Sequence, residues 1–286
     1  MEVVNEFDPW GGELCTCPNK YSLNPYTGCG HRCIYCYATY IPNFFRPRRK
    51  KNLVERIERD LERIPPGSII SLSNSSDPYT PMDEEHQDTR NCLETMKGYN
   101  LRILLVTKSD LVLRDIDLLR DLKSAVTLTI TALKKEVHRK LEPNAPSPHR
   151  RLEAMRELEK EGIPTGLRLD PIFPELTVKE SGEIIEKAEE AGVRHVVTST
   201  FKPRKDGWNR FRKAFPDTAE RVKPLYFQSG EKIGNSWYLP EKIRKRVVEK
   251  VKEECLERGI DFATCREGFS EMRTAGSCDG SHLIEE

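Results

Sequence analysis

Short apolar stretches alternate with helical patterns over the first 200 residues, and this alternation sets narrow limits on the fold. Apolar, β-branched stretches between turn residues are typical of buried strands. Six occur, at 21–23, 68–73, 101–106, 125–131, 164–170 and 193–199. Helical spacing of apolar residues lies between them, at 53–64, 84–97, 109–122, 149–161 and 179–191. Strands that alternate with helices predict an α/β fold with a parallel sheet.

Six strand–helix units suit two architectures that the pattern alone does not separate, an incomplete barrel and an open, doubly wound sheet. After residue 199 the alternation stops, and an irregular stretch leads to a helical pattern over 240–258 and the segment 261–265. We therefore divide the chain into an N-terminal segment (1–19), a βα domain (20–200) and a C-terminal extension (201–286). The extension either packs on the main sheet or stands alone.

Hydropathy excludes a membrane span, and the near-zero net charge excludes long-range attraction of a charged partner. Lysine and arginine number 47 and aspartate and glutamate 46, so a polyanionic partner must be held by a local patch. No stretch reaches the roughly 18 consecutive apolar residues of a membrane helix. The N-terminus lacks the basic start and apolar run of an export signal. We therefore expect a reducing, cytoplasmic location, where disulfides are rare.

Nine cysteines are present, and five of them fall within the first 36 residues. Cys29, Cys33 and Cys36 form a C-x3-C-x2-C motif after the first expected strand. Soft thiolates select iron–sulfur, zinc or Cu(I) centres, and structural zinc takes four ligands. Three cysteines without a nearby fourth favour a cluster with one open iron. The alternatives are a zinc site with a distant fourth ligand, and His31 as a ligand rather than a solvated loop residue.

The motif, with the aromatic Tyr35 before its last cysteine, resembles the signature of radical S-adenosylmethionine (SAM) enzymes. The resemblance implies a partial (β/α)6 barrel of the TIM type, in agreement with the six units counted above. It implies a [4Fe-4S] cluster on Cys29, Cys33 and Cys36, whose open iron chelates SAM, with Tyr35 in the cofactor site. Reduction by a donor such as ferredoxin or flavodoxin would split SAM into methionine and a 5′-deoxyadenosyl radical that abstracts hydrogen from a substrate.

A narrower resemblance covers most of the first 200 residues. The segment YSLNPYTGCGHRCIYCYA is similar to the start of spore photoproduct lyase-related proteins, the DNA repair photolyase-like branch. A second similar block runs from Glu142-Pro143 through Arg151 to Pro171-Ile172. Two blocks in the right order support this branch, but they do not determine the substrate.

Residues just after the expected strands would surround SAM, because the carboxyl ends of parallel strands carry the chemistry of βα barrels. After the second strand come Ser75, Ser76 and Asp77, where many radical SAM enzymes have a Gly-Gly-Glu segment. These residues either bind the methionine amino group or form a capped turn. Lys108 follows the third strand, and it either binds the SAM carboxylate or ribose or lies on the solvated surface.

Further candidates follow the later strands. Thr131 ends the fourth strand, and Asp170 ends the fifth, where it points at adenine or substrate. Arg151, in the second similar block, either pairs with the SAM carboxylate or forms a salt bridge on its own helix, to Glu153 or Glu157.

The resemblance also raises the question of a hydrogen donor. Photoproduct lyases return hydrogen through a cysteine near the site, and no cysteine of this chain has an evident position for that role. Cys92 and Cys255 lie in expected helices, where small buried side chains are typical. Tyr79 is the candidate that remains.

The remaining cysteines indicate a second metal site. Cys15, Cys17, Cys265 and Cys278 would complete four thiolates around an auxiliary iron–sulfur cluster or zinc, with His282 as the alternate ligand. Unrelated free thiols are the alternative. The location stays open, because the first strand places Cys17 at the bottom of a barrel, whereas a strand before Cys265 would carry that residue to the top.

Two segments, 44–51 and 202–213, combine basic residues with aromatic ones, Trp208 and Phe211 among them. Such segments suit single-stranded nucleic acid or flipped bases, and the alternative is a solvated basic surface. The sequence therefore predicts a radical SAM enzyme acting on DNA or RNA. The alternatives are a radical SAM enzyme acting on a protein, peptide or small molecule, and a non-catalytic, zinc-containing module that binds nucleic acid.

Overall fold

The structure is a computed structural model that describes residues 2–7 and 14–284. Its centre is an eight-stranded sheet in the order β1-β2-β5-β6-β7-β8-β9-β12. The strands are β1 (Val4–Glu6), β2 (Tyr21–Leu23), β5 (Ile69–Leu72), β6 (Arg102–Thr107), β7 (Lys123–Thr129), β8 (Thr165–Ile172), β9 (His195–Thr200) and β12 (Asp261–Thr264). β1 is antiparallel to β2, and every other neighbouring pair is parallel. The expected α/β partial barrel of the TIM type is confirmed.

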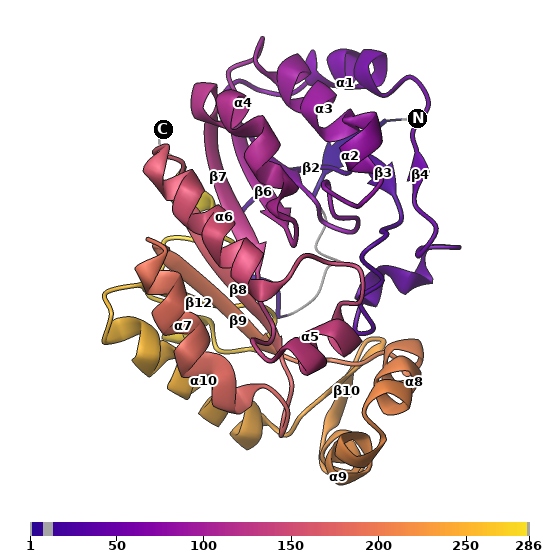
Figure 1. Cartoon of the computed structure of the whole chain (residues 1–286), viewed down its shortest axis with the longest axis vertical. Coiled ribbons are helices and arrows are strands. Elements are labelled where there is room, and N and C mark those ends of the chain that lie inside the picture. The colour runs from indigo at the N-terminus through magenta and orange to yellow at the C-terminus, as the bar shows by residue number, and fades with distance from the viewer. Residues whose placement is uncertain (1, 8–13, 285–286) are drawn as a thin grey trace.

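Helices cover the outer face of this curved sheet (Figure 1). They are α1 (Leu53–Leu61), α3 (Asp88–Met96), α4 (Ile116–Asp121), α6 (Pro148–Lys160), α7 (Ser181–Glu190) and α10 (Glu241–Leu256). Their buried faces, with Ile57, Leu93, Leu158 and Val248, join strand residues such as Leu105 in the main hydrophobic core. Each such side chain contributes about 1.5–3 kcal/mol of burial free energy. No helix in the described ranges is long and apolar enough to cross a bilayer.

The C-terminal part of the chain extends the same sheet. β12 pairs in parallel with β9, with Phe262 opposite Val196, and α10 packs on α7 and β12. The tail that follows lies against the inner face of the barrel, where Ile284 joins Leu104 and Ala125 and where Gly280 approaches Thr127. The tail fills the amino-terminal end of the barrel, so an open cavity remains towards the carboxyl ends of the strands.

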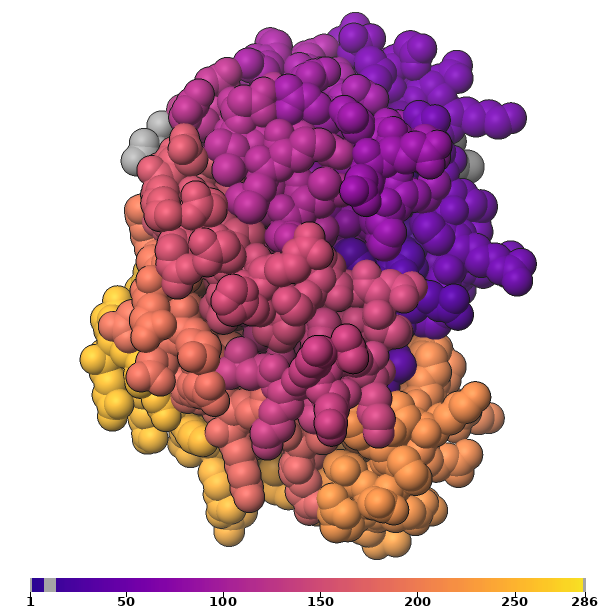
Figure 2. Space-filling model, viewed as in Figure 1, coloured from indigo at the N-terminus to yellow at the C-terminus, as the bar shows by residue number. Residues whose placement is uncertain are grey.

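Residues 205–238 form a separate lobe, visible as the orange corner in Figures 1 and 2. It contains α8 (Lys205–Ala214), α9 (Pro216–Phe227) and a hairpin of β10 (Glu231–Ile233) and β11 (Ser236–Tyr238). Trp208 and Phe211 are 7% and 1% exposed, and they pack with Tyr226 in an aromatic core. The interpretation of these two rings as surface aromatics among basic residues is therefore wrong, because the lobe needs them for its own core.

Candidate active site

The loop after β2 carries the cysteine triplet into the barrel mouth. A short ribbon of β3 (Tyr26–Thr27) with β4 (Arg48–Arg49) frames this loop, and the Cys29 N–H donates to the Phe44 carbonyl at 2.8 Å. Cys29 and Cys33 are 9% and 7% exposed. Burial raises the pKa of the Cys29 thiol to about 12 and raises the pKa of Cys33 as well, so a positive partner is needed for either to be a thiolate.

Contacts from distant elements hold the cluster loop in place. Gly28 has a φ of +91°, and a Cβ there would lie 2.5 Å from the Phe44 carbonyl oxygen, so only glycine fits. The Gly30 N–H donates to Thr80 Oγ1 at 2.7 Å. Arg210 of α8 donates to the carbonyls of Ile34 and Cys36, at 2.7 and 2.9 Å. The lobe thus fixes the loop through an arginine of the second basic segment.

A cavity of about 310 Å³ lies at the carboxyl ends of the strands and is lined by all three thiols of the triplet. Tyr35, Ser75, Asp77, Lys108 and Asp170, all expected in the cofactor site, also line it. The structure therefore brings together the thiols and five of the eight expected cofactor residues. Ser76, Thr131 and Arg151 do not line the cavity and lie behind its wall.

Asp77 fixes the segment after β5. Its carboxylate accepts hydrogen bonds from Thr107 Oγ1 at 2.7 Å and from the Lys108 N–H at 2.8 Å, and it lies 3.4 Å from His31 Nε2. Burial alone would raise the pKa of Asp77, but His31, Thr107 and Lys108 outweigh it and lower the pKa. His31 is 1% exposed, so the interpretation of this residue as a solvated loop histidine is wrong.

The neighbouring serines are held by a side chain that precedes the triplet. Asn24 Oδ1 accepts from the backbone N–H groups of Ser75 and Ser76, at 3.0 and 3.1 Å, and Ser76 Oγ accepts from the Gly28 N–H at 3.0 Å. Ser75 is thereby presented to the cavity, while Ser76 supports the cluster loop. The turn is thus both capped and part of the cavity wall.

Glu142 organises the other wall, and the sequence had given this residue no role. It is fully buried and accepts from Arg151 Nη2 at 2.6 Å and from the Tyr35 hydroxyl. Burial would raise its pKa, but Arg151, His138 and Lys108 hold the pKa of Glu142 well below its usual range. A glutamate in a block that resembles a known family was the signal available in the sequence.

Arg151 is fully buried too and has no contact with the cavity. Besides Glu142, it donates to the carbonyls of Thr129 and Pro146, at 2.7 and 3.0 Å. Thr131 Oγ1 donates to the same glutamate at 3.3 Å. Both residues therefore position Glu142, which in turn fixes the Tyr35 ring beside the thiols.

Lys108 lines the cavity at the end of β6, and Asp170 lines it from β8, two strands away in the sheet. The Lys108 ammonium lies 5.8 Å from the centre of the Tyr35 ring, and Cys33, Glu142 and Asp77 raise its pKa against the effect of burial. Asp170 pairs with Arg168 at 2.8 Å and accepts from the Ser199 hydroxyl. The cavity thus offers a cation beside the thiols and, two strands away, a carboxylate that also pairs with Arg168. Two such groups suit a zwitterionic ligand that carries an amine and a carboxylate.

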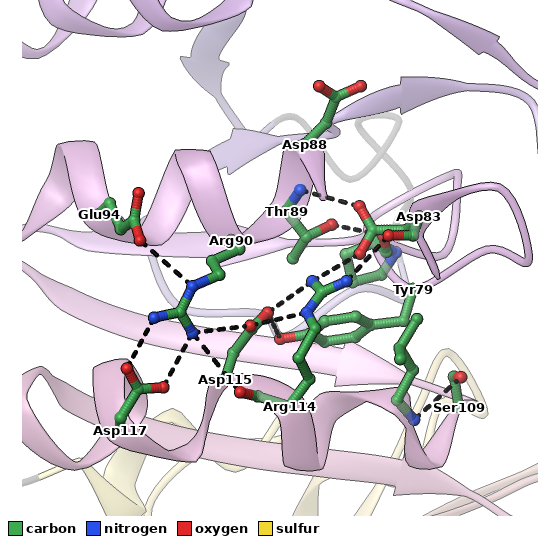
Figure 3. Close-up of polar contacts among 12 residues, drawn as sticks. Tyr79, Asp83, Asp88, Thr89, Arg90, Glu94, Ser109, Arg114, Asp115 and Asp117 are labelled. Atoms are coloured by element: carbon green, nitrogen blue, oxygen red, sulfur yellow. Dashed lines mark hydrogen bonds and ion pairs between the residues drawn. The ribbon is translucent and has the colours of Figure 1, made fainter. Parts of the chain in front are cut away.

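Tyr79 lies outside the cavity, in a polar network between α3 and the segment before α4 (Figure 3). Its hydroxyl donates to Asp115 Oδ2 at 3.0 Å, and Arg114 bridges Asp115 and Asp83 at 2.8 and 2.9 Å. Tyr79 is 1% exposed. The structure therefore does not bring this expected hydrogen donor together with the thiols.

The four cysteines of the expected second site line the same cavity as the triplet. β12 carries Cys265 to the carboxyl end of the sheet, and the tail brings Cys278 Sγ to 3.6 Å from Cys17 Sγ. Cys15 hydrogen-bonds Cys17. His282 lies elsewhere, with Nδ1 2.8 Å from Ser277 Oγ and Nε2 3.3 Å from Asp261.

The triplet fits the [4Fe-4S] cluster that its motif implies. Its thiols come from one loop, line one cavity and interact electrostatically with one another and with Lys108. No three metal-ligating side chains in residues 2–7 and 14–284, those of the triplet included, stand close enough to share a single ion. In a cluster each thiolate binds its own iron, so the three thiols need not share one ion.

Comparison with known families agrees with this site. The radical SAM superfamily matches residues 23–188, which run from the end of β2 into α7 and include the cluster loop. The chain belongs to the radical SAM superfamily. Within that superfamily its fold is similar to that of spore photoproduct lyase.

Several relatives carry no assigned function. An uncharacterized protein of Methanocaldococcus jannaschii is 35% identical over 166 residues, which are 55% of this chain and 62% of the relative. An uncharacterized protein of Acidianus two-tailed virus is 31% identical over 177 residues, 56% of this chain and 58% of that protein. The chain therefore spans about three fifths of the length of these two relatives. The radical SAM Nalpha-GlyT isomerase of Pseudomonas phage M6 is 23% identical over 259 residues, 85% of this chain and 53% of the isomerase.

Solved structures support the fold. A spore photoproduct lyase variant with bound AdoMet and dinucleoside spore photoproduct has a TM-score of 0.69 at 19% identity, over 88% of this chain and 78% of that one. Streptococcus suis SuiB bound to S-adenosylmethionine has a TM-score of 0.59 at 14% identity, over 87% and 52%. Membership of the radical SAM superfamily favours an enzyme over a non-catalytic zinc module.

Proposed function

We propose that this enzyme cleaves SAM reductively and acts on a nucleic acid, DNA or RNA, which it repairs or modifies. The cluster and SAM, when bound, supply the 5′-deoxyadenosyl radical. Cys29, Cys33 and Cys36 hold the cluster, while Lys108 and Asp170 orient the two charged ends of the methionine moiety. Tyr35, fixed by Glu142, covers the cluster loop and limits access of water to it.

The rim of the cavity carries the proposal on the substrate. A short 3-10 turn (Tyr37–Tyr40) follows Cys36, and Tyr37 and Tyr40 are 49% and 44% exposed. The guanidinium of Arg204 lies 5.4 Å from the centre of the Tyr40 ring, and Tyr37 lines the cavity itself. Exposed aromatic rings beside cations suit stacked or flipped bases.

A second pocket, of about 550 Å³, adjoins this rim. It is lined by Arg204, Lys205, Trp237 and Lys232, from α8, its N-terminal side and the hairpin. It therefore offers positive charge and an indole within reach of the rim, as a strand that leaves the cavity would require. The dinucleoside spore photoproduct bound by the lyase variant favours the same substrate class.

A protein or peptide substrate is the second candidate. SuiB, whose fold is similar at a TM-score of 0.58, is described with a bound precursor peptide. The first basic segment supports this candidate, because Phe44 is buried and Arg49 pairs with Asp88 at 2.7 Å, which leaves fewer free cations for phosphates.

The two candidates are separated by binding and turnover measured on anaerobically reconstituted enzyme with a reduced ferredoxin or flavodoxin, the donor we propose for cells. We expect single-stranded DNA or tRNA to bind with an affinity that falls steeply with salt and to increase 5′-deoxyadenosine formation. The variant Tyr40→Ala/Arg204→Ala should lose most of this affinity, whereas Arg156→Ala, at a half-exposed arginine of α6, should keep it. No salt-dependent affinity for either nucleic acid would reject the proposal in favour of a peptide or small molecule.

A further inference from the structure

Two pairs of cysteines from opposite ends of the chain meet at the open side of the barrel. Cys15 and Cys17 precede β2 near one edge of the sheet, while Cys265 and Cys278 follow β12 at the other edge. Cys17 packs with Cys265, Cys278 and Ala263 in a small buried cluster. Two hundred and sixty-one residues separate Cys17 from Cys278, so this meeting is a product of the fold.

One pair of sulfurs stands at the spacing of metal ligands. Cys17 Sγ and Cys278 Sγ lie 3.6 Å apart. Two thiolates on one tetrahedral ion, each about 2.3 Å from it, stand about 3.8 Å apart. Cys15 hydrogen-bonds Cys17, and Cys265 interacts electrostatically with Cys15, Cys17 and Cys278.

Three cations lie near these thiols, and each also pairs with a carboxylate, of Asp279, Asp170 or Glu267. Lys20, Arg168 and Lys202 interact electrostatically with thiols of this group. Four thiolates around a divalent ion carry two negative charges, which would be costly to bury without nearby cations. Lys202 also donates to the Cys265 carbonyl at 3.1 Å and fixes the loop after β12.

We propose that Cys15, Cys17, Cys265 and Cys278 bind a second thiophilic metal centre, separate from the catalytic cluster. Cys17 and Cys278 share one ion, and Cys15 and Cys265 complete its coordination or bind a second iron of a small cluster. The described thiols do not all stand at the distance of a single ion, a property they share with the catalytic triplet. This inference does not depend on the nucleic-acid substrate.

His282 is not a ligand in this arrangement. Its Nδ1 lies 2.8 Å from Ser277 Oγ, its Nε2 faces the Asp261 carboxylate at 3.3 Å, and its ring packs edge-on against His195. The metal centre would instead join the two open edges of the sheet, next to the buried ion pair of Lys20 with Asp279. Since it adjoins the cavity of the catalytic cluster, it also defines one wall of that cavity.

The test removes the catalytic cluster and asks what metal stays. We expect the variant Cys29→Ala/Cys33→Ala/Cys36→Ala, purified without oxygen, to retain a stoichiometric amount of metal. This metal is either zinc without sulfide or iron with acid-labile sulfide. Elemental and sulfide analysis distinguishes the two metals. Retention of either supports the site, and a protein that holds neither, before and after reconstitution with each, overturns it.

A second set of variants assigns the ligands. Adding Cys17→Ser and Cys278→Ser to the triple variant should abolish the retained metal, whereas adding Cys92→Ser, a buried cysteine of α3, should not. Cobalt(II) loading of the triple variant provides a measurement without further mutation, because thiolate–cobalt charge-transfer bands report sulfur ligation. Absence of these bands, or metal retention in the Cys17→Ser/Cys278→Ser background, would count against the assignment.

Discussion

The guanidinium nitrogens of Arg151 all contact protein groups, so none of them is free to bind a ligand. Its guanidinium contacts Glu142, His138 and two carbonyls, and none of its surface is exposed. The helix salt bridges expected as its alternative role do form on α6, but between Arg156 and Glu153. A buried arginine in such a network is a positioning residue, because it fixes the carboxylate that holds the Tyr35 hydroxyl.

Removal of this guanidinium should destabilise the fold strongly. We expect Arg151→Met to lower the free energy of unfolding by about 3–5 kcal/mol, since Glu142 would be left as an uncompensated buried charge. Arg150→Met is the matched control, because the neighbouring side chain is 64% exposed and should cost about 0.5 kcal/mol or less. Denaturant unfolding of both variants provides the measurement, and equal midpoints would contradict this role.

Asp60 links the N-terminal strand to α1 and makes stability depend on pH. Its carboxylate accepts from the N–H groups of Val3 and Val4, at 2.6 and 3.2 Å. Burial opposes ionisation, but these hydrogen bonds and Arg59 outweigh it, so the pKa of Asp60 is lowered. A carboxyl whose pKa is lower in the folded protein stabilises the fold at pH values above its unfolded pKa of about 3.9. This stabilisation is lost as the pH falls through the pKa of the folded state.

The variant Asp60→Asn should therefore be less stable than the unmodified chain at pH 7, by about 1–3 kcal/mol. The difference should shrink as the pH is lowered towards 3, because the unmodified carboxyl becomes protonated as well. Urea unfolding at the two pH values measures it. Glu62→Gln, an exposed change on the following turn, is the control, and a difference that does not vary with pH would refute the argument.

The conformation of the cluster loop depends on one glycine, Gly28. Gly28 and Gly67 both have a positive φ, of +91° and +81°, but a Cβ would meet Phe44 at the first and open space at the second. Substitutions at the two positions therefore distinguish the effect of backbone strain from the effect of displacing the loop.

We expect Gly28→Ala to lower iron and sulfide content after anaerobic reconstitution severalfold, because the loop must move away from Phe44. Gly67→Ala should cost about 1–2 kcal/mol of strain and leave the iron and sulfide content unchanged. Iron and sulfide analysis of both proteins, with thermal unfolding alongside, provides the comparison. Equal loading in the two variants would show that the loop tolerates the displacement.

At the level of the whole chain, the sheet is completed by its last strand. β12 covers the edge of β9, and Phe262 is buried in the main core. The tail then fills the amino-terminal end of the barrel. Residues beyond α10 are therefore structural for the barrel.

A truncation after residue 258 should abolish cooperative thermal unfolding, because it exposes the β9 edge and empties the barrel interior. Insertion of two glycines after Gly234, at the tip of the β10–β11 hairpin, should shift the melting temperature by only about 3 °C. Differential scanning calorimetry of both proteins measures this. A truncated protein that melts like the full chain would show that the extension is dispensable.

Much of the fold was predictable from short-range patterns. The six strands, their helices and the Cys29–Cys36 spacing depend on neighbouring residues, since side-chain periodicity and chelate spacing are local properties. The same patterns placed Ser75, Asp77, Lys108 and Asp170 at strand ends, where they line the cavity.

Tertiary packing decided the rest. Glu142 accepts a hydrogen bond from Tyr35, Tyr79 bonds Asp115 rather than facing the thiols, and Trp208 is buried in the lobe. The meeting of Cys17 with Cys278 likewise depended on the closing of the sheet between its two ends. Contacts between residues so far apart follow from the path of the whole backbone, and no local pattern records that path.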